Sequence, residues 1–395
     1  MPRLPPQWNT VAQTAWEDNR RNDAIQTLVG EINASGPEKP EAAVLQLAYY
    51  LFLIGDYRSA ATVLETRLTS TTNPAITLNL AVCYLRLRRF ADAVAMAQRT
   101  LARQPDNIVA HDTLASACFG LGDLAAARQA GTRALQLKAA AARPAASDWR
   151  LPAGSPAAWA DLPGKSPVIA FSLWGSQPRY LRGGLRNLLL AADLYPGWRL
   201  RFYHDATVPA EFIALIHELD GETIQQPDGQ SLRQKLCWRF QVANDPTVGR
   251  FLVRDVDSVF SLREANAVAE WQASERWFHV IRDWWTHTDL ILAGLWGGIA
   301  GVLPELSAML AEYDSQRMET PNVDQWFLGE RVWGYLQHSC LIHDRCFDQP
   351  GSRRLPTPGD DRHIGQNEAV LALQERLLRP WIERHPCLGE LPPAS

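Results

Sequence analysis

The stretch Leu53–Ala60 reads LIGDYRSA, and two related stretches follow it, LRRFADA at Leu87–Ala93 and LGDLAAA at Leu121–Ala127. All three share a bulky residue followed three places later by alanine, at intervals of 33 and 34 residues: Tyr57, Phe90 and Leu124 with Ala60, Ala93 and Ala127. A period near 34 with small residues at fixed places is typical of a repeated pair of helices. Residues 1–140 are therefore predicted to form an α-solenoid.

This pattern resembles the tetratricopeptide repeat family, and Pro74 and Pro105 lie near the repeat ends as that family's pattern expects. We expect three full repeats over about 41–140, preceded by a degenerate unit whose second helix opens at Asn22–Ile25. Such solenoids present a concave surface to a protein partner. The alternative is that the solenoid only packs on the rest of the chain.

The composition fits a folded protein of two or three domains, with 395 residues, 46% hydrophobic and 21% charged. The formal net charge of −4 argues against a general nucleic-acid binder. Six scattered cysteines form no CxxC pair, which favours free thiols in a reducing compartment. Because neither a signal peptide nor a run of ~20 apolar residues is visible, we expect a bacterial cytoplasmic protein without a membrane span.

Residues 141–166 are rich in proline and alanine and are predicted to be a linker or an extended strap. After it, residues 167–395 alternate between strand and helix patterns. The predicted strands are Val168–Leu173, Trp198–His204, Arg250–Arg254, Trp277–Ile281 and Leu341–Asp344, and the helices are Tyr180–Asp193, Glu211–Leu219, Leu232–Ala243 and Leu303–Tyr313. This alternation predicts a parallel α/β sheet that binds ligands at the carboxyl ends of its strands.

Two carboxylates end the third of these strands, in the sequence Arg254-Asp255-Val256-Asp257. Side chains two residues apart point to the same side of a strand, so Asp255 and Asp257 can converge on one cation. Hard oxygen ligands suit Mg²⁺ or Mn²⁺, which also bind phosphate oxygens. The pair therefore predicts a metal site that binds a nucleotide diphosphate.

With its DxD pair at the end of a buried strand, the segment of roughly 167–370 resembles glycosyltransferases of the GT-A fold. The resemblance implies a nucleotide-sugar donor, with Mn²⁺ or Mg²⁺ held by Asp255 and Asp257. Several families of this fold supply a third metal ligand from a late histidine, a role the resemblance gives to His343. Asp344 or His363 are substitutes for it, and an ordinary surface or core histidine is the alternative.

The resemblance also suggests which residues hold the donor. Trp174, Gly175 and Ser176 follow the first strand, where the base and ribose would lie. Lys235 and Arg239, one helical turn apart, would contact the diphosphate together with Arg254, or would form a solvated helix face. Gly294 and Gly297 would let the backbone approach the sugar, or would form a packing turn.

Asp324 and Asp283 are the candidate catalytic carboxylates, and either would deprotonate the acceptor in an inverting enzyme. Asp324 as a helix N-cap and Asp283 in a plain loop between tryptophans are the alternatives. We therefore expect an α-solenoid followed by an α/β glycosyltransferase domain that moves a sugar to a glycan, peptide or other hydroxyl acceptor. The competing functions are an interaction scaffold with a silent transferase-like domain, and a metal-dependent phosphoesterase using Asp255, Asp257 and His343.

Overall fold

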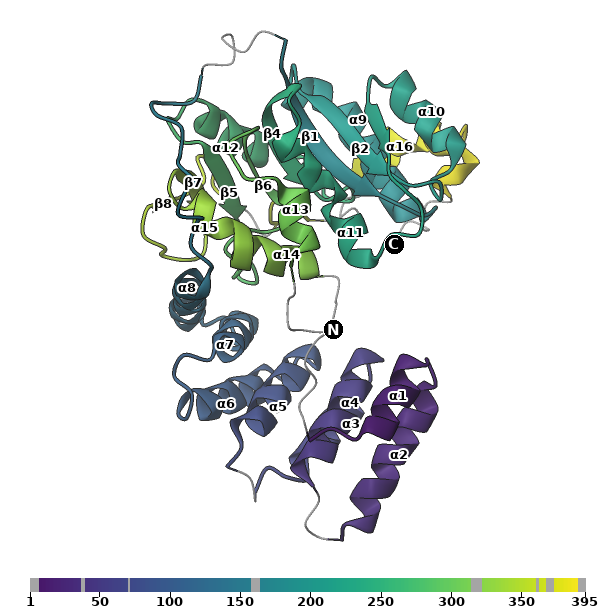
Figure 1. Ribbon diagram of the computed structural model, residues 1–395, viewed down its shortest axis with the longest axis vertical. Helices are drawn as coiled ribbons and strands as arrows, with labels where there is room; N and C mark the ends of the chain where they lie inside the picture. Colours follow the sequence, from purple (N-terminus) through teal and green to yellow (C-terminus); the bar gives the residue numbers. More distant parts are fainter. Residues whose placement is uncertain are drawn as a thin grey trace. The chain divides into compact units, whose positions relative to one another are not determined.

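A computed structural model describes residues 7–36, 40–69, 72–157, 164–313, 322–359, 362–366 and 373–389 of the chain (Figure 1). The chain divides into two compact units, Met1–Leu137 and Lys138–Ser395. The first is helical and the second is built around a sheet. Among the described helices, none is both long enough and apolar enough to span a membrane.

The first unit is a row of helix pairs, in which each helix from α1 to α6 packs on the next. The described residues of this region form the helices α1 (Thr10–Glu17), α2 (Arg21–Ala34), α3 (Glu41–Leu53), α4 (Tyr57–Glu65), α5 (Pro74–Arg86), α6 (Phe90–Leu101), α7 (Ile108–Gly120) and α8 (Leu124–Ala141). The alanines predicted to let paired helices approach, Ala60, Ala93 and Ala127, are fully buried. The predicted repeats are confirmed, and α1 and α2 form the predicted degenerate first unit.

The turn inside each pair has the same backbone conformation. One residue of each turn has a positive φ between 59° and 83°: Asn19, Gly55, Arg88 and Gly122. The next residue donates its N–H to a carbonyl five residues back, at 2.8 to 3.0 Å, which satisfies a free carbonyl at the helix end. The same turn conformation therefore recurs in all four helix pairs, although only two of the four residues with positive φ are glycines.

The second unit contains an eight-stranded mixed sheet. The strands are β1 (Ser166–Leu173), β2 (Arg199–His204), β3 (Glu222–Gln225), β4 (Val248–Arg254), β5 (Phe278–Arg282), β6 (Leu295–Ile299), β7 (Cys340–Asp344) and β8 (Ser352–Arg353). They lie in the order β3-β2-β1-β4-β6-β5-β7-β8. All neighbours are parallel except that β6 runs antiparallel to β4 and β5.

The predicted α/β class is confirmed, but the expectation of a purely parallel sheet is wrong. β6 lies in a glycine-containing segment in which no strand was expected, and the short edge strand β3 was not predicted either. The first four strands follow the order 3-2-1-4, the order of doubly wound nucleotide-binding sheets. Such sheets bind ligands where the strand order reverses, which here is between β1 and β4.

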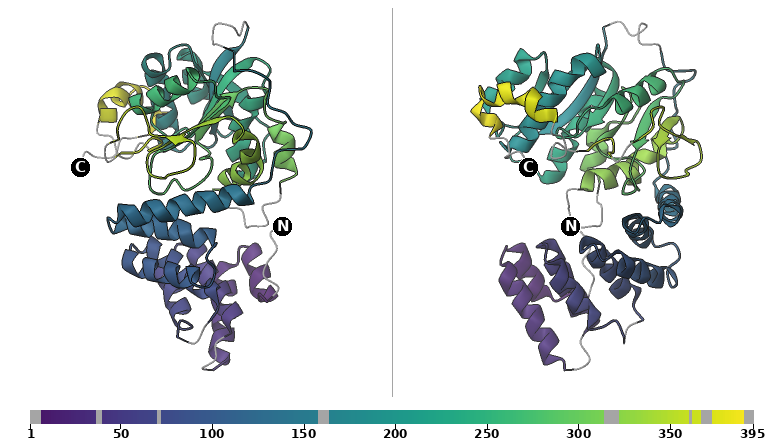
Figure 2. Two further views of the ribbon diagram at one scale, coloured as in Figure 1. Left: turned by 90° about the vertical axis from the view of Figure 1, so that its left-hand side faces the viewer. Right: turned by 180° about the vertical axis from the view of Figure 1, so that it is seen from behind.

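Helices cover both faces of the sheet (Figure 2). Side chains of β4 alternate between the faces: Arg254 contacts Glu264 of α12 (Leu262–Gln272), whereas Phe251 lies against Trp296, which contacts Phe240. The same face as α12 carries α9 (Pro178–Leu194) and α10 (Ala210–Glu218), and α16 (Leu373–Ile382) packs on the outside of α9. The other face carries α11 (Leu232–Cys237) with its 3₁₀ continuation Trp238–Asn244, then α13 (Leu306–Ala311), α14 (Val323–Phe327), the π-helical turn Leu328–Val332 and α15 (Trp333–Leu336).

The described part of the proline- and alanine-rich segment packs along the second unit. The Arg143 N–H donates to the Glu330 carbonyl at 2.9 Å, and the Trp149 indole N–H donates to the Val302 carbonyl at 3.0 Å. The Trp149 ring also meets the Tyr335 ring edge-on at 5.2 Å. This segment therefore forms a strap on the α/β unit; residues 158–163 lie outside the described residues.

Candidate functional site

The candidate site lies at the carboxyl edge of the sheet, where β1 and β4 are neighbours. Trp174–Ser176 leave β1 at this edge, and Asp255–Asp257 leave β4. Gly294 reaches the same edge because it directly precedes the antiparallel strand β6. The predicted donor-binding and metal-binding segments are thus brought together at the point where the strand order reverses.

Helix α9 holds the turn after β4 in place. The Asn187 side-chain amide donates to the Ser258 carbonyl at 2.8 Å, and the Ser258 N–H donates to the Asp255 carbonyl at 3.0 Å. Gly183 faces the turn so closely that a Cβ there would lie 2.6 Å from the Asp257 Cα atom. The backbone carrying the two carboxylates is therefore fixed by close packing.

Asp255 is bound from two sides while half of it remains open to solvent. Its Oδ1 atom accepts a hydrogen bond from Arg239, and its side chain is 49% exposed. A Cβ on Gly294 would lie 2.6 Å from the Asp255 Cγ atom. Gly294 thus makes room for this carboxylate. Gly297, by contrast, lies inside the sheet against Leu252, so its predicted role at the sugar is wrong.

Arg239 joins Asp255 to the buried Asp324. Its Nη2 atom donates to Asp324 Oδ2 at 3.0 Å, its Nη1 atom also donates to the Arg254 carbonyl at 2.9 Å, and both side chains of the pair are 4% exposed. Burial raises the pKa of Asp324 to about 6, while Arg239 lowers it. Asp324 is not the helix N-cap, a position held by Asn322. Asp324 binds Arg239 and is too buried to accept a proton from an acceptor hydroxyl.

Asp257 is paired with Arg179, from the first turn of α9. Both the Nε atom, at 2.7 Å, and the Nη2 atom of Arg179 donate to Asp257 Oδ2. The arginine side chain is 52% exposed and that of Asp257 is 12% exposed. Arg179 was not among the predicted site residues, although its position in the first helical turn after β1 was an available signal.

The predicted base-binding loop is tied to the loop after β2. The Gly175 N–H donates to Thr207 Oγ1 at 2.7 Å, and Thr207 in turn donates to Asp205. Lys235 also binds Asp205, with 2.7 Å between Nζ and Oδ2. Lys235 therefore points to this edge of the sheet, with the buried carboxylate of Asp205 as its partner.

His343 lies in β7, three strands across the sheet from β4, and not beside Asp255 and Asp257, which corrects its predicted role as third metal ligand. It is fully buried inside β7, with Nδ1 2.8 Å from His279 Nε2 and Nε2 3.1 Å from Glu270 Oε2. Burial lowers the pKa of His343, whereas Glu270 raises it. The substitute Asp344 is equally buried, with its Oδ2 atom 2.8 Å from Arg282 Nε.

Two further predicted site residues are structural. Arg254 is 1% exposed and forms an ion pair with Glu264, on the face opposite Arg239. Asp283 is fully buried and accepts hydrogen bonds from Arg263 at 2.7 Å and from the Ile364 N–H at 2.8 Å. The predicted role of Arg254 at the diphosphate and of Asp283 as a catalytic base are therefore both wrong.

The loop that carries His363, the other substitute ligand, is attached to the turn after β4. The Ser258 hydroxyl donates to the Gly365 carbonyl at 3.1 Å, and the Val259 N–H donates to the Gln366 carbonyl at 3.2 Å. The His363 ring itself lies beside Trp284, with the ring centroids 5.3 Å apart. Its environment is thus aromatic.

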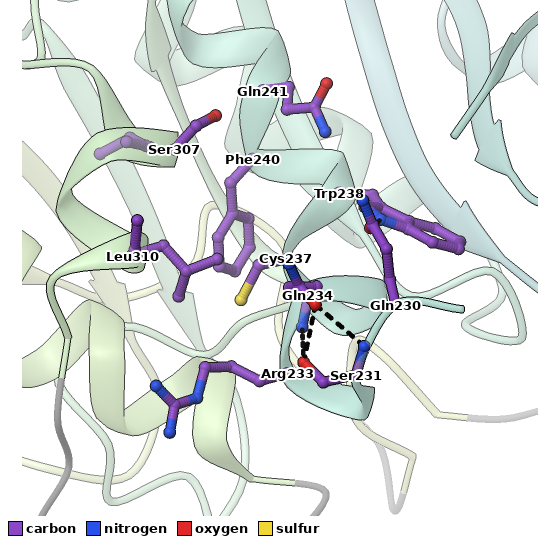
Figure 3. Close-up of a pocket in the computed structure, with 12 residues that line it drawn as sticks. Gln230, Ser231, Arg233, Gln234, Cys237, Trp238, Phe240, Gln241, Ser307 and Leu310 are labelled. Carbon is purple, nitrogen blue, oxygen red and sulfur yellow. Dashed lines mark hydrogen bonds between the residues drawn. The ribbon is translucent and has the colours of Figure 1, made fainter. Parts of the chain in front are cut away.

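A cavity of about 350 Å³ opens between α11 with its 3₁₀ continuation and α13 (Figure 3). Gln234, Cys237 and Gln241 line it from one helical face, and Leu310 lines it from α13. Lys235 and Arg239 are on the opposite face by their helical spacing. The cavity is therefore separate from the turn after β4 that carries Asp255 and Asp257, called the carboxylate turn below.

Asp255 and Asp257 are the side chains of this turn that could hold Mg²⁺ or Mn²⁺. Asp255 Oδ2 and Asp257 Oδ1 receive no hydrogen bond from the part of the chain that the structure describes. Within that part, no group of three or more His, Cys, Asp or Glu side chains is placed to hold a metal. Mg²⁺ is commonly held by one or two carboxylates together with substrate phosphates, so the donor set suits a cation that arrives with a diphosphate.

Comparison with known proteins finds a family match in the solenoid. Residues 51–118 match the tetratricopeptide repeat family. Solved structures similar to the chain include MamA, residues 41 to the end, from Desulfovibrio magneticus RS-1 (18% identity, 32% of this chain and 72% of that chain, TM-score 0.30). Another is a crystal structure of MamA protein (21% identity, 33% and 70%, TM-score 0.30). No curated protein matches the chain. The family match indicates a protein partner for the solenoid.

Proposed function

We propose that the α/β unit is a nucleotide-sugar-dependent glycosyltransferase and that the solenoid binds a protein partner. The observation that carries the proposal is the meeting of Asp255, Asp257 and Gly175 where the strand order reverses. The resemblance to the GT-A fold adds the donor class, a sugar on a nucleotide diphosphate. The tetratricopeptide match supports the partner.

Asp255 and Asp257 would hold Mn²⁺ or Mg²⁺. The cation would supply positive charge for the diphosphate that leaves the sugar. The chain's own residues orient this site: Arg239 fixes Asp255 from a buried position, and Gly183 fixes the backbone of Asp257. Lys235 adds a cation at the same edge, near the loop predicted to hold the base.

The two carboxylates predicted to be catalytic bases, Asp283 and Asp324, are both enclosed by other residues. Asp283 is enclosed by Arg263 and a backbone N–H, and Asp324 is bound to Arg239, so neither is proposed to deprotonate an acceptor. Asp324 is proposed as a positioning residue, because it holds Arg239 against Asp255. The phosphoesterase alternative loses its third ligand, since His343 is bound to His279 and Glu270 and lies away from the carboxylates.

Binding of the donor is the first test. Wild-type protein should gain thermal stability from UDP- or GDP-sugars only when Mn²⁺ is present, because a ligand that binds only the folded state stabilises it. Asp257→Ala should lose this effect and the release of nucleoside diphosphate. Asp193→Ala, an exposed carboxylate on α9, is the control and should keep both. Unchanged turnover in Asp257→Ala would sink the proposal.

An interaction scaffold with a silent α/β unit is the second candidate. Two observations favour it: the family match lies wholly inside the solenoid, and an arginine already neutralises each carboxylate. In that case no nucleotide sugar shifts the melting temperature with or without Mn²⁺, while a pull-down with the solenoid residues still recovers a partner. Metal-dependent stabilisation by a nucleotide sugar decides for the transferase.

A further inference from the structure

Two arginines bind the carboxylates of this turn, and they differ in exposure, whereas the buried Arg186 donates to the Asp257 carbonyl at 3.5 Å. Arg239 is 4% exposed and is held by Asp255, Asp324 and the Arg254 carbonyl. Arg179 is 52% exposed and binds one oxygen of Asp257. An exposed ion pair is worth little because water screens it and two long side chains must be ordered. Of these two, Arg179 is therefore the arginine whose contact with Asp257 can be exchanged.

The backbone beside Arg179 stays fixed when its side chain moves. Gly183, one turn further along α9, packs on the Asp257 backbone, and Asn187 binds the Ser258 carbonyl at 2.8 Å. The Arg179 guanidinium consequently remains within reach of any ligand bound to Asp257. Only its terminal groups need to turn.

We propose that Arg179 is a diphosphate-binding residue that Asp257 holds in reserve. A metal–diphosphate ligand weakens the Arg179–Asp257 ion pair, because the cation competes for the carboxylate. The phosphate in turn binds the guanidinium more strongly than Asp257 does. Arginine binds phosphate through two parallel N–H donors, which a single carboxylate oxygen does not match. This inference rests on the proposed function, since the ligand is the diphosphate of that donor.

The test compares Mn²⁺ binding with diphosphate binding in the full chain. Free Mn²⁺ is measured by electron paramagnetic resonance, and UDP binding in the presence of Mn²⁺ by calorimetry. Arg179→Gln should bind Mn²⁺ alone about 2- to 5-fold more tightly, because it removes a competing surface ion pair. The same variant should bind UDP with Mn²⁺ at least about 10-fold more weakly, because it loses charged hydrogen bonds.

Arg182→Gln, one turn along the same helix, removes the same charge and is the matched control; both affinities should stay near those of the wild type. Arg179→Lys keeps the charge without the paired donors and should recover only part of the UDP affinity. Tighter Mn²⁺ binding with unchanged UDP binding would overturn the phosphate role of Arg179, and so would equal effects of Arg179→Gln and Arg182→Gln. Wild-type protein that binds neither Mn²⁺ nor UDP contradicts the proposed function, and this inference with it.

Discussion

Replacing Gly294 with alanine separates the position of Asp255 from the stability of the fold. Gly294 is not among the glycines with positive φ, so the backbone accepts alanine and only the space for the methyl group matters. A Cβ there overlaps Asp255 Oδ2 and lies 2.6 Å from its Cγ and 3.0 Å from its backbone nitrogen. Carbon atoms in contact lie about 3.5 Å apart, so the carboxylate has to move by roughly 1 Å.

This movement should change the free energy of unfolding little and should weaken metal binding strongly. The Asp255 side chain is 49% exposed and turns into solvent, so the free energy of unfolding should stay within about 1 kcal/mol of the wild type. The displaced carboxylate leaves Arg239 and no longer aligns with Asp257. Loss of such alignment lowers metal affinity about 10- to 100-fold in proteins, which is the reduction expected for Mn²⁺ measured with UDP present.

Gly297→Ala is the matched control. Its new methyl group would lie 2.7 Å from Leu252 Cδ2 inside the sheet, where nothing can swing into solvent. We expect a loss of about 1–3 kcal/mol in chemical denaturation, and Mn²⁺ affinity near the wild-type value in the folded protein. The reasoning is refuted if Gly294→Ala loses as much stability as Gly297→Ala and keeps its Mn²⁺ affinity.

Three other experiments address the buried network and the solenoid turns. Burial raises the pKa of Asp324 from 3.8 to about 6, so the stability that its protonation contributes is fully present below pH 3.8 and is lost as the pH rises through 6. The resulting change in the free energy of unfolding is on the order of 3 kcal/mol. Urea unfolding of Asp324→Asn should not show this pH dependence. A slope that persists in this variant contradicts the assignment. His343→Asn should lower the free energy of unfolding by about 2 kcal/mol and leave Mn²⁺ affinity within about twofold; a tenfold loss of affinity, on the order of 1.4 kcal/mol, would return His343 to the metal site. In the solenoid, Gly55→Ala should destabilise by about 1 kcal/mol and Arg88→Gly should not, because both positions have positive φ; thermal unfolding followed by circular dichroism checks the sign.

The solenoid and most strands could be predicted from the sequence because their signals are local. The alanines recur at a fixed period, and runs such as Val168–Leu173 are apolar throughout. The turns carried a weaker signal, since Asn19 and Arg88 adopt the conformation that glycine adopts elsewhere. Their left-handed conformation is imposed by the helix pair and not by the residue type.

The position and direction of β6, and the presence of β3, could not be predicted from the sequence. β6 contains Gly297 and Gly298, and glycine is uncommon inside strands. Its place is set by neighbours, since a side chain at Gly298 would meet the Phe278 ring at 2.6 Å. β3 is a four-residue edge strand with no apolar run. Both strands depend on contacts with distant parts of the chain, which composition does not report.

The candidate site was partly predictable for a similar reason. Residues directly after a strand, such as Asp255, reach the carboxyl edge whatever the sheet order. Residues inside a strand point to one face or the other, and the sequence does not say what covers that face. Arg254 therefore meets Glu264, and His343 meets His279 and Glu270, instead of a ligand.

The Arg239–Asp324 pair bears on whether this edge is a binding site or only part of the fold. A buried ion pair adds little net stability, because both charges lose their water, and apolar residues of similar size often stabilise a core as well. Packing alone therefore gives no reason for a buried arginine to reach past Asp324 to a half-exposed carboxylate. Its effect is to hold Asp255 in one orientation beside Asp257. Preorganised charges of this kind act on a ligand that binds there, which is the reason to look for a metal-bound diphosphate at this turn.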